Sequence, residues 1–307
     1  MSNIYHDVLI LGAGPGGLTA GIYAKRAGVD VALIEKGLEG GVVSSTHQVS
    51  NYTGFINISG MELAEKMTEH AKSFNVPFYQ DEIKKVYLDG DKKIIECFSS
   101  TYECKCLIIA LGAEVRKLNV EGERSFIGRG VSYCATCDGR LYKDKTVAVV
   151  GDGSIALEDS IYLSGLAKKV YLIHGREEFL GQKFLYDQVL KSGNVEIVKN
   201  STIVSISGGE RLENITLLNK EKGENSTIQV DGLFVCVGRG PDTGMLDMDI
   251  KKDNDGYIVT DGEMRTSIDG VFAVGDIRTT PLRQIITACS DGAIAATKAF
   301  EYLRIHK

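Results

Sequence analysis

The sequence predicts an α/β fold made of two Rossmann-like dinucleotide-binding domains. The first observation is a glycine-rich turn between an apolar strand and a helix, a pattern that occurs twice in the chain. The second is a shared spacing, because Glu35 lies 23 positions after Gly12 and His174 lies 23 positions after Gly151. The third is length, since 307 residues are enough for two domains.

The first dinucleotide-type unit begins at residues 7–11, where an apolar run after Asp7 is typical of a parallel strand buried on both faces. The run leads into Gly-x-Gly-x-x-Gly, formed by Gly12, Gly14 and Gly17, and a helical pattern follows. These glycines allow a tight turn and a close approach to a pyrophosphate, while Glu35 can accept a hydrogen bond from a ribose hydroxyl. Together these features predict a dinucleotide site.

Residues 40–113 continue this domain. The polar loop at 40–54 is long enough to cover a ligand, and residues 60–74 have the apolar spacing of a helix. Residues 83–109 alternate as antiparallel strands do. Cys104 and Cys106 lie two positions apart there, so we expect them on the same face of one strand.

The second dinucleotide-type unit starts at residue 146, where strand, glycine turn, helix and strand are expected again. Further strand-like segments follow over 195–237. Near the end, a short strand at 270–274 precedes Gly275 and Asp276, and a long helix is expected to open at 281–284. Linkers are expected at the charged stretch 114–130 and at 238–241.

Between the two units lies Cys134-Ala135-Thr136-Cys137-Asp138-Gly139. A Cys-x-x-Cys pair can form a reversible disulfide, bind a metal or do nothing chemical. A zinc site needs two further ligands, and the five histidines are scattered, so we expect no metal. The other five cysteines lie in apolar or alternating segments, where cysteine behaves as a small buried hydrophobe.

The net charge of −6, without a long basic run, argues against binding to nucleic acid or to anionic membranes. No apolar run approaches the ~18 residues of a transmembrane helix. The N-terminus has neither the basic start nor the apolar core of a signal peptide. We therefore expect a cytoplasmic protein.

Taken together, these motifs resemble the low-molecular-weight thioredoxin reductases over essentially the whole chain. The resemblance rests on the first glycine motif, the Cys-Ala-Thr-Cys-Asp-Gly segment, Gly275-Asp276 and Arg283-Gln284. It implies an oxidoreductase that acts on disulfides, with thioredoxin as acceptor, and a homodimer. It also implies an FAD-binding domain from residues 1–113 and 242–307, with residues 114–241 inserted as an NAD(P)-binding-like domain.

The resemblance also implies roles for single residues. Cys137 would face the flavin, Cys134 would exchange with the outside disulfide, and Asp138 would transfer the proton. Gly275 and Asp276 would hold the ribityl chain of FAD, and Arg283 and Gln284 would lie beside the isoalloxazine. The FAD residues are then Gly12, Gly14, Gly17, Glu35, Gly275, Asp276, Arg283 and Gln284.

The second domain departs from the family pattern. NADPH-dependent members carry His-Arg-Arg-x-x-x-Arg, whose arginines bind the 2′-phosphate, but here Gly175 and Leu180 replace two of them and only Arg176 remains. Asp152 also places a carboxylate in the phosphate loop, although the glycine pattern survives. In this the chain resembles the ferredoxin-dependent flavin thioredoxin reductases, which implies reduced ferredoxin as electron donor.

Three other functions are open at this point. The first is a thioredoxin reductase that uses NADPH or NADH. The second is a ferredoxin–NADP reductase of the same fold, which would lack the Cys134–Cys137 pair. The third is a non-catalytic flavoprotein that senses redox state, which the intact Asp138 argues against.

Overall fold

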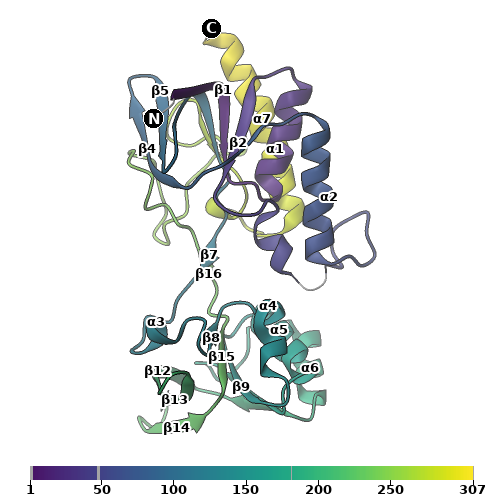
Figure 1. Ribbon diagram of the computed structural model, residues 1–307, viewed down its shortest axis with the longest axis vertical. Coiled ribbons are helices and arrows are strands. Elements are labelled where there is room, and N and C mark those ends of the chain that lie inside the picture. Colours follow the sequence, from purple (N-terminus) through teal and green to yellow (C-terminus); the bar gives the residue numbers. More distant parts are fainter. Residues whose placement is uncertain (1–2, 47–48, 181, 307) are drawn as a thin grey trace. The chain divides into compact units, whose positions relative to one another are not determined.

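A computed structural model describes residues 3–46, 49–180 and 182–306 (Figure 1). The chain divides into unit 1, Met1–Glu114 with Gly240–Lys307, and unit 2, Val115–Arg239. These bounds differ by one and two residues from the expected domain ends at 113 and 242. Which ligand each unit binds stays a prediction.

Unit 1 is built on a mixed sheet that has seven strands within the described residues. Its parallel strands run in the order β3-β2-β1-β6, and β17 pairs with the second half of β6. The first half of β6 pairs with β5, which pairs with β4, both antiparallel. The strands are β1 (Asn3–Leu11), β2 (Val31–Glu35), β3 (Phe78–Gln80), β4 (Ile83–Asp89), β5 (Lys92–Cys97), β6 (Thr101–Ile109) and β17 (Val271–Ala273).

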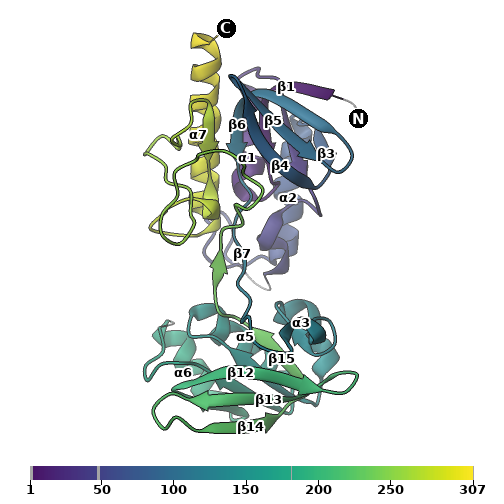
Figure 2. The same ribbon diagram turned by 90° about the vertical axis from the view of Figure 1, so that its left-hand side faces the viewer.

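Helices cover one face of this sheet, as Figures 1 and 2 show. They are α1 (Pro15–Arg26), α2 (Gly60–Ser73) and α7 (Ile285–Ile305). Two short helices precede α2 and α7 in the chain, namely η1 (Gly41–Ser45) and η3 (Gly275–Ile277). The long C-terminal helix starts at Ile285, with Gln284 as its N-cap, so the expected start at 281–284 was slightly early. Apolar residues on the other face of the sheet, such as Leu9 and Leu107, pack against Leu246 and Ile258.

The expectation for Cys104 and Cys106 was wrong. Both are buried, but Cys106 packs with the helix-covered face and Cys104 with the opposite face. The neighbouring strand β1 shows the same break. Its residues Ile4 and Leu9 are an odd number of positions apart, so regular alternation would place them on opposite faces, but both pack on one face. The alternation of side chains therefore breaks in both paired strands at this point.

Unit 2 has a parallel sheet of five strands in the described part of the chain, in the order β11-β10-β9-β15-β8. Its edge strand β8 is short and ends just before the cysteine motif. The strands are β8 (Val131–Ser132), β9 (Thr146–Val150), β10 (Lys169–Ile173), β11 (Val195–Val198) and β15 (Gly232–Val235). The helices are α3 (Glu123–Phe126), α4 (Ala135–Asp138), η2 (Gly139–Tyr142), α5 (Ser154–Ser164) and α6 (Lys183–Lys191).

An antiparallel layer completes unit 2 (Figure 2). It consists of β12 (Ser201–Gly208), β13 (Leu212–Asn219) and β14 (Asn225–Gln229). The two segments that connect the units pair with each other as β7 (Glu114–Val115) and β16 (Arg239–Gly240). The two connections between the units therefore form one two-stranded sheet.

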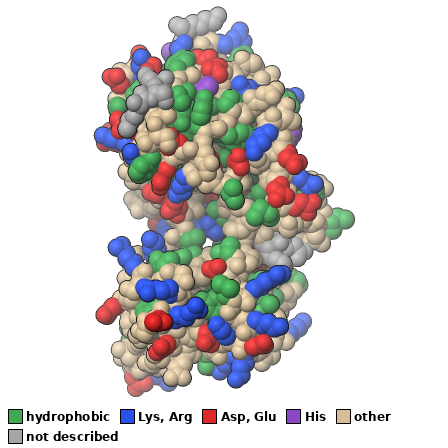
Figure 3. Space-filling view, viewed as in Figure 1, with side chains coloured by type: hydrophobic (Ala, Val, Ile, Leu, Met, Phe, Trp, Pro, Cys, Tyr) green, Lys and Arg blue, Asp and Glu red, His purple; other side chains and the backbone are tan. Residues whose placement is uncertain are grey.

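The surface of unit 2 carries both signs of charge. On the face that Figure 3 shows, its Lys and Arg side chains are interspersed with Asp and Glu side chains. Within the described ranges, no helix has the length and apolar character needed to span a membrane.

Candidate active site

Cys134 and Cys137 form a disulfide, with their Cα atoms 5.4 Å apart. The edge strand β8 delivers Cys134 as the N-cap of the one-turn helix α4. The sulfur of Cys134 accepts a hydrogen bond from the backbone N–H of Cys137 at 3.2 Å. An N–H donor at this place stabilises a thiolate when the bond opens, and thiolate is the reactive form.

Asp138, the third predicted residue of this motif, lies beside the same turn. Its carboxylate accepts a hydrogen bond of 2.7 Å from the hydroxyl of Ser132. The Ser132 oxygen in turn accepts from the backbone N–H of Cys134 at 3.1 Å. The hydroxyl therefore joins the acid to the backbone of the cysteine. The sequence analysis missed Ser132, and a polar residue at the end of a buried strand was the only signal.

A buried carboxylate, that of Glu123, binds the residue just before the cysteine motif. Glu123 is 1% exposed and accepts from the hydroxyl of Tyr133 at 2.8 Å. It also accepts from the backbone N–H groups of Leu118 and Asn119 in the segment that leads from β7. Burial and this hydrogen bond hold the pKa of Tyr133 above its usual value, so the phenol stays a donor. Glu123 thus ties the linker segment to the residue before Cys134.

The five other cysteines are free thiols. Burial raises the pKa of Cys97 and of Cys106 to about 12, and it also raises the pKa of Cys104, Cys236 and Cys289. A thiol with a raised pKa is a poor nucleophile at neutral pH. In the part of the chain that the structure describes, no three His, Cys, Asp or Glu side chains are grouped so as to hold a metal.

The first glycine motif of unit 1 forms an open cradle at the end of β1. Gly12 has a φ of +99°, and a Cβ atom there would lie 2.5 Å from the Ala110 carbonyl oxygen. A Cβ atom on Gly17 would lie 2.0 Å from the Gly12 carbonyl oxygen. Gly14, the N-cap of α1, faces open space, with no atom within 4 Å of a Cβ position. Side chains are thus excluded where the turn is tight, and room is left where a phosphate would meet the helix N-terminus.

Glu35 lies at the end of β2 beside this cradle. Its two carboxylate oxygens accept from the backbone N–H groups of Ala13 and Gly37, each at 2.9 Å. A carboxylate oxygen has two lone pairs, so each can still accept from a ribose hydroxyl. Backbone groups beside the predicted dinucleotide site therefore hold the Glu35 side chain in place.

Gly275 and Asp276 lie at the same edge of the sheet, because Leu11, Ile109 and Ala273 are in register on adjacent strands. Gly275 has a φ of +72°, and Asp276 is partly exposed. A Cβ atom on Gly16 would lie 3.2 Å from both Val274 and the Ala288 carbonyl oxygen, so the first turns of α1 and α7 meet here.

Arg283 and Gln284 precede α7 at that edge. The Arg283 guanidinium lies 4.0 Å from the centre of the Tyr257 ring, and the Gln284 side chain accepts from Asn51 at 2.8 Å. The fold therefore gathers all eight predicted FAD residues at the carboxyl edge of the sheet in unit 1. Two helix N-termini, an open glycine turn and a carboxylate with free lone pairs fit an anionic dinucleotide.

The corresponding edge of unit 2 is different. Arg176, the remaining arginine, makes an ion pair of 2.8 Å with Asp152 in the phosphate loop. The backbone N–H of Leu180 donates to the Asp152 carbonyl at 3.0 Å, so the segment 175–180 lies over the loop. A Cβ atom on Gly175 would lie 2.8 Å from the Lys220 ammonium nitrogen. Lys220 therefore lies where the side chain of the missing arginine would begin.

His174, which stands where an NAD-binding domain would carry an acid, is 1% exposed. Neither of its ring nitrogens has a hydrogen-bond partner among the described residues. The ring instead packs edge-on against Phe179, with centroids 4.9 Å apart. Burial and nearby Lys199 lower its pKa, so the imidazole is neutral near pH 7.

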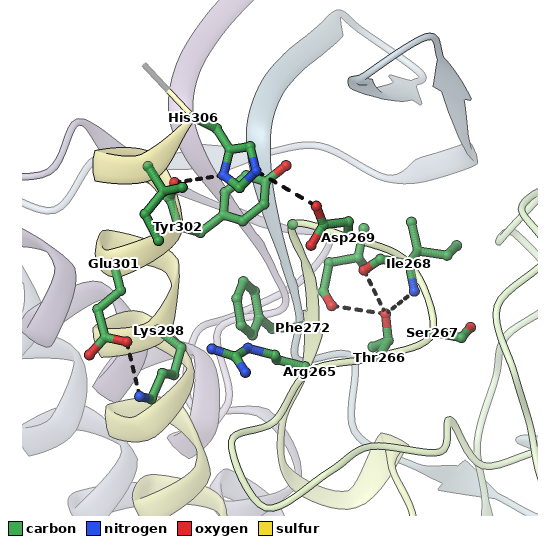
Figure 4. A pocket seen from close by; sticks show the side chains of 13 residues that line it. Arg265, Thr266, Ser267, Ile268, Asp269, Phe272, Lys298, Glu301, Tyr302 and His306 are labelled. Carbon is green, nitrogen blue, oxygen red and sulfur yellow. Dashed lines mark hydrogen bonds and ion pairs between the residues drawn. The ribbon is translucent and has the colours of Figure 1, made fainter.

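A cavity of about 390 Å³ in unit 1 lies away from all of these residues. Figure 4 shows it between the C-terminal end of α7 and the segment that enters β17. Its cations are already neutralised, because Arg265 and Lys298 both pair with Glu263, and Lys298 pairs with Glu301 as well. With its charges paired internally, this cavity has no evident attraction for a charged ligand.

Comparison with known proteins defines the class. The family model for pyridine nucleotide-disulphide oxidoreductases matches residues 6–292. The chain belongs to this family, and the two predicted Rossmann-like domains are confirmed as its fold class. FAD is the cofactor of the family and of its thioredoxin reductase members, as predicted.

Within the family, the chain is a disulfide oxidoreductase of the low-molecular-weight thioredoxin reductase type. It is 43% identical over 300 residues to the thioredoxin reductase of Listeria monocytogenes, covering 97% of this chain and 94% of that one. The thioredoxin reductase structure from Lactococcus lactis has a TM-score of 0.94 at 35% identity, covering 98% and 99% of the two chains. A ferredoxin-flavin thioredoxin reductase from Clostridium acetobutylicum has a TM-score of 0.56 at 31% identity, covering 99% and 100%.

Proposed function

We propose that this protein is an FAD-dependent thioredoxin reductase whose electron donor is reduced ferredoxin rather than a nicotinamide nucleotide. Thioredoxin as acceptor is supported by the relatives and by the Cys134–Cys137 disulfide. The observation that carries the choice of donor is the ion pair between Arg176 and Asp152 in unit 2. The proposal places the enzyme in the cytoplasm.

The proposed reaction uses the cysteine pair as a two-electron carrier. Two electrons and two protons convert the Cys134–Cys137 disulfide into two thiols. The Cys134 thiolate then attacks the disulfide of thioredoxin, which forms a mixed disulfide and releases one thioredoxin thiolate. Attack by the Cys137 thiolate on Cys134 releases the second thioredoxin thiol and restores the starting disulfide. The order of the two cysteines follows the family pattern.

Asp138 is the proposed proton carrier in this cycle. Its carboxylate can receive the proton from a cysteine and return it to the leaving thiolate of thioredoxin. The Ser132 hydroxyl, at 2.7 Å, fixes the orientation of that carboxylate. Because Ser132 also bonds the Cys134 backbone, the acid and the cysteine keep one relative geometry.

The electrostatics of the second glycine turn, in unit 2, argue against NADPH as the electron donor. The Arg176–Asp152 pair is half exposed and contributes little to stability, but it occupies the one arginine of segment 174–180 and keeps a carboxylate in the phosphate loop. Gly175 and Leu180 also remove two charge-assisted contacts worth about 1.5–3 kcal/mol each. FAD, when bound, supplies a carrier that accepts electrons singly and delivers them in pairs, which suits a one-electron donor.

The test is anaerobic flavin reduction. The FAD-loaded protein is mixed separately with reduced ferredoxin, NADPH and NADH, and the visible absorbance of the flavin is followed. We expect ferredoxin to bleach it and micromolar nucleotide to leave it unchanged. In Cys134→Ser, bleaching by ferredoxin should persist while thioredoxin reduction stops. Fast bleaching of the wild type by micromolar NADPH would contradict the proposed donor.

A matched gain-of-function variant sharpens this test. Asp152→Gly, Gly175→Arg and Leu180→Arg together remove the loop carboxylate and restore two arginines. We expect NADPH to bind at least about 100-fold more tightly, as two regained charge-assisted contacts imply. Gly175→Arg also has to displace Lys220, so Asp152→Gly with Leu180→Arg serves as the control that avoids this contact.

A nicotinamide donor is the second candidate function. It is favoured by Gly153 of the second glycine motif, where a Cβ atom would meet nothing within 4 Å. It is also favoured by the thioredoxin reductases to which the chain is similar. Bleaching by NADPH with no response to ferredoxin would select it.

A homodimer is also part of the proposal. Large apolar side chains of unit 1 are exposed near its carboxyl edge, namely Phe55, Ile56, Met61, Leu282 and Ile286. A second copy of the chain would remove this apolar surface from water. Analytical ultracentrifugation at micromolar concentration distinguishes the dimer from a monomer.

A further inference from the structure

An ion pair buried in unit 1 has no part in the thiol or flavin chemistry described above. Arg278 and Asp291 bind each other through two hydrogen bonds, Nε to Oδ2 at 2.7 Å and Nη2 to Oδ1 at 2.9 Å. The side chains are 13% and 8% exposed. Removing two charges from water is costly, so such a pair needs a reason beyond general stability.

The further contacts of this pair supply the reason. Oδ2 of Asp291 also accepts from the backbone N–H of Gly275 at 3.0 Å. Arg278 uses Nη1 to donate to the Thr260 hydroxyl at 3.0 Å and to the Thr279 carbonyl at 2.8 Å. The pair therefore joins η3, the strand-like segments at 258–260 and 278–279, and helix α7.

Gly275 connects this network to Asp276, a predicted FAD residue. Gly275 adopts the left-handed φ of +72°, and its orientation sets that of Asp276, the next residue. Its buried N–H needs an acceptor, and the Asp291 carboxylate is that acceptor. One residue further along α7, a Cβ atom on Gly292 would lie 2.1 Å from the Gly16 carbonyl oxygen in the first turn of α1. Helix α7 thus contacts the Asp276 turn through Asp291 and the first turn of α1 through Gly292.

We propose that Arg278 and Asp291 are positioning residues for the FAD site. They hold the Gly275–Asp276 turn and the first turn of α1 in the arrangement that binds FAD, without contacting FAD themselves. The inference rests on the proposed role of Asp276 and of the first glycine motif. It concerns FAD affinity and does not depend on which donor or acceptor the enzyme uses.

The experiment titrates FAD into the apoprotein and follows quenching of flavin fluorescence. The key variant is Arg278→Met combined with Asp291→Leu, which removes the pair and leaves no unpaired buried charge. We expect its FAD Kd to rise by about 10- to 100-fold, the range found for groups that orient metal ligands. Arg278→Lys should fall between this variant and the wild type, because it keeps the charge and loses the bidentate contact.

Two further measurements separate positioning from stability. Arg265→Met removes a different ion pair in unit 1, that with Glu263, and should leave the FAD Kd unchanged within about twofold. The visible circular dichroism of bound FAD should change in Arg278→Lys even at saturation, since the turn that orients the flavin has moved.

An FAD Kd within twofold of wild type in the double variant overturns the proposal. Where the double variant does not fold, an unchanged visible circular dichroism of bound FAD in Arg278→Lys overturns it. Failure of the wild type to reduce thioredoxin, with normal FAD binding, would refute the proposed function and leave this inference standing.

Discussion

Single side chains in unit 2 hold the groups that the proposed reaction uses. Ser132 ties the Asp138 carboxylate to the cysteine turn, and Glu123 ties Tyr133 to the linker segment. Both act through hydrogen bonds to backbone groups as well as to side chains, so they hold geometry rather than charge. The two cysteines are also joined by the helix turn that begins between them, with Cys134 as its N-cap.

His174 makes stability depend on pH. Burial and Lys199 lower its pKa in the folded state, while Asp152 and Glu177 oppose this shift. The unfolded chain therefore binds the proton first as pH falls below about 6.5, so this group's stability contribution is present above that pH and is lost below it. We expect wild type to lose up to about 1.4 kcal/mol per pH unit more than His174→Leu in this window.

Urea unfolding of both proteins at pH 7.5, 6.5 and 5.5, followed by the far-UV ellipticity of the whole chain, checks this expectation. Equal pH dependence in wild type and variant would show that His174 keeps an ordinary pKa. Comparing differences between the two proteins removes the contributions of the other four histidines, which both share.

At the scale of elements, the contact between α1 and α7 shapes the edge of the sheet where FAD is proposed to bind. Gly292→Ala would place a methyl group 2.1 Å from the Gly16 carbonyl oxygen and 3.0 Å from the Ala20 nitrogen. Alanine favours a helix by about 1 kcal/mol over glycine, but a forced backbone shift costs about 1–3 kcal/mol or more. The clash with backbone should dominate, so we expect a lower unfolding temperature and weaker FAD retention.

Gly262→Ala is the matched control, because a Cβ atom there meets nothing within 4 Å. It should change stability by less than about 0.5 kcal/mol. Differential scanning calorimetry and the FAD content after gel filtration measure both effects. A Gly292→Ala protein that keeps its FAD and its melting temperature would mean that the helices separate without cost.

At the scale of the whole molecule, the two units should respond differently to loss of the cofactor. As proposed, FAD binds only unit 1, and it would then stabilise that unit by about 4 kcal/mol at a free concentration of 1,000 Kd. Removal of FAD should therefore speed hydrogen exchange in β1 and α7 and leave β9 and β10 unchanged. Mass-spectrometric exchange of holoprotein and apoprotein provides the measurement, and equal acceleration in both units would contradict FAD binding to unit 1 alone.

The sequence was sufficient for the repeated sheets, because Gly12 and Gly151 each sit between an apolar strand and a helix, a local pattern that tertiary packing preserves. It was not sufficient for contacts set by packing. Nothing in the order of residues shows that Arg176 turns back to Asp152, or that Asp291 meets Arg278. Ser132 was missed because a serine at a strand end is common. Cys104 and Cys106 were misplaced because strand alternation fails there.

The pairing of β7 with β16 has a consequence for how such a protein can change over time. The backbone N–H of Arg116 donates to the Gly238 carbonyl at 3.0 Å, so the chain leaves unit 1 and returns to it at nearly the same point. To unit 1, all of unit 2 is equivalent to one surface loop. A segment with adjacent ends can be exchanged for another without disturbing its host. Under the proposed function, evolution can thus alter the source of electrons within the inserted segment while the proposed FAD-binding host stays the same.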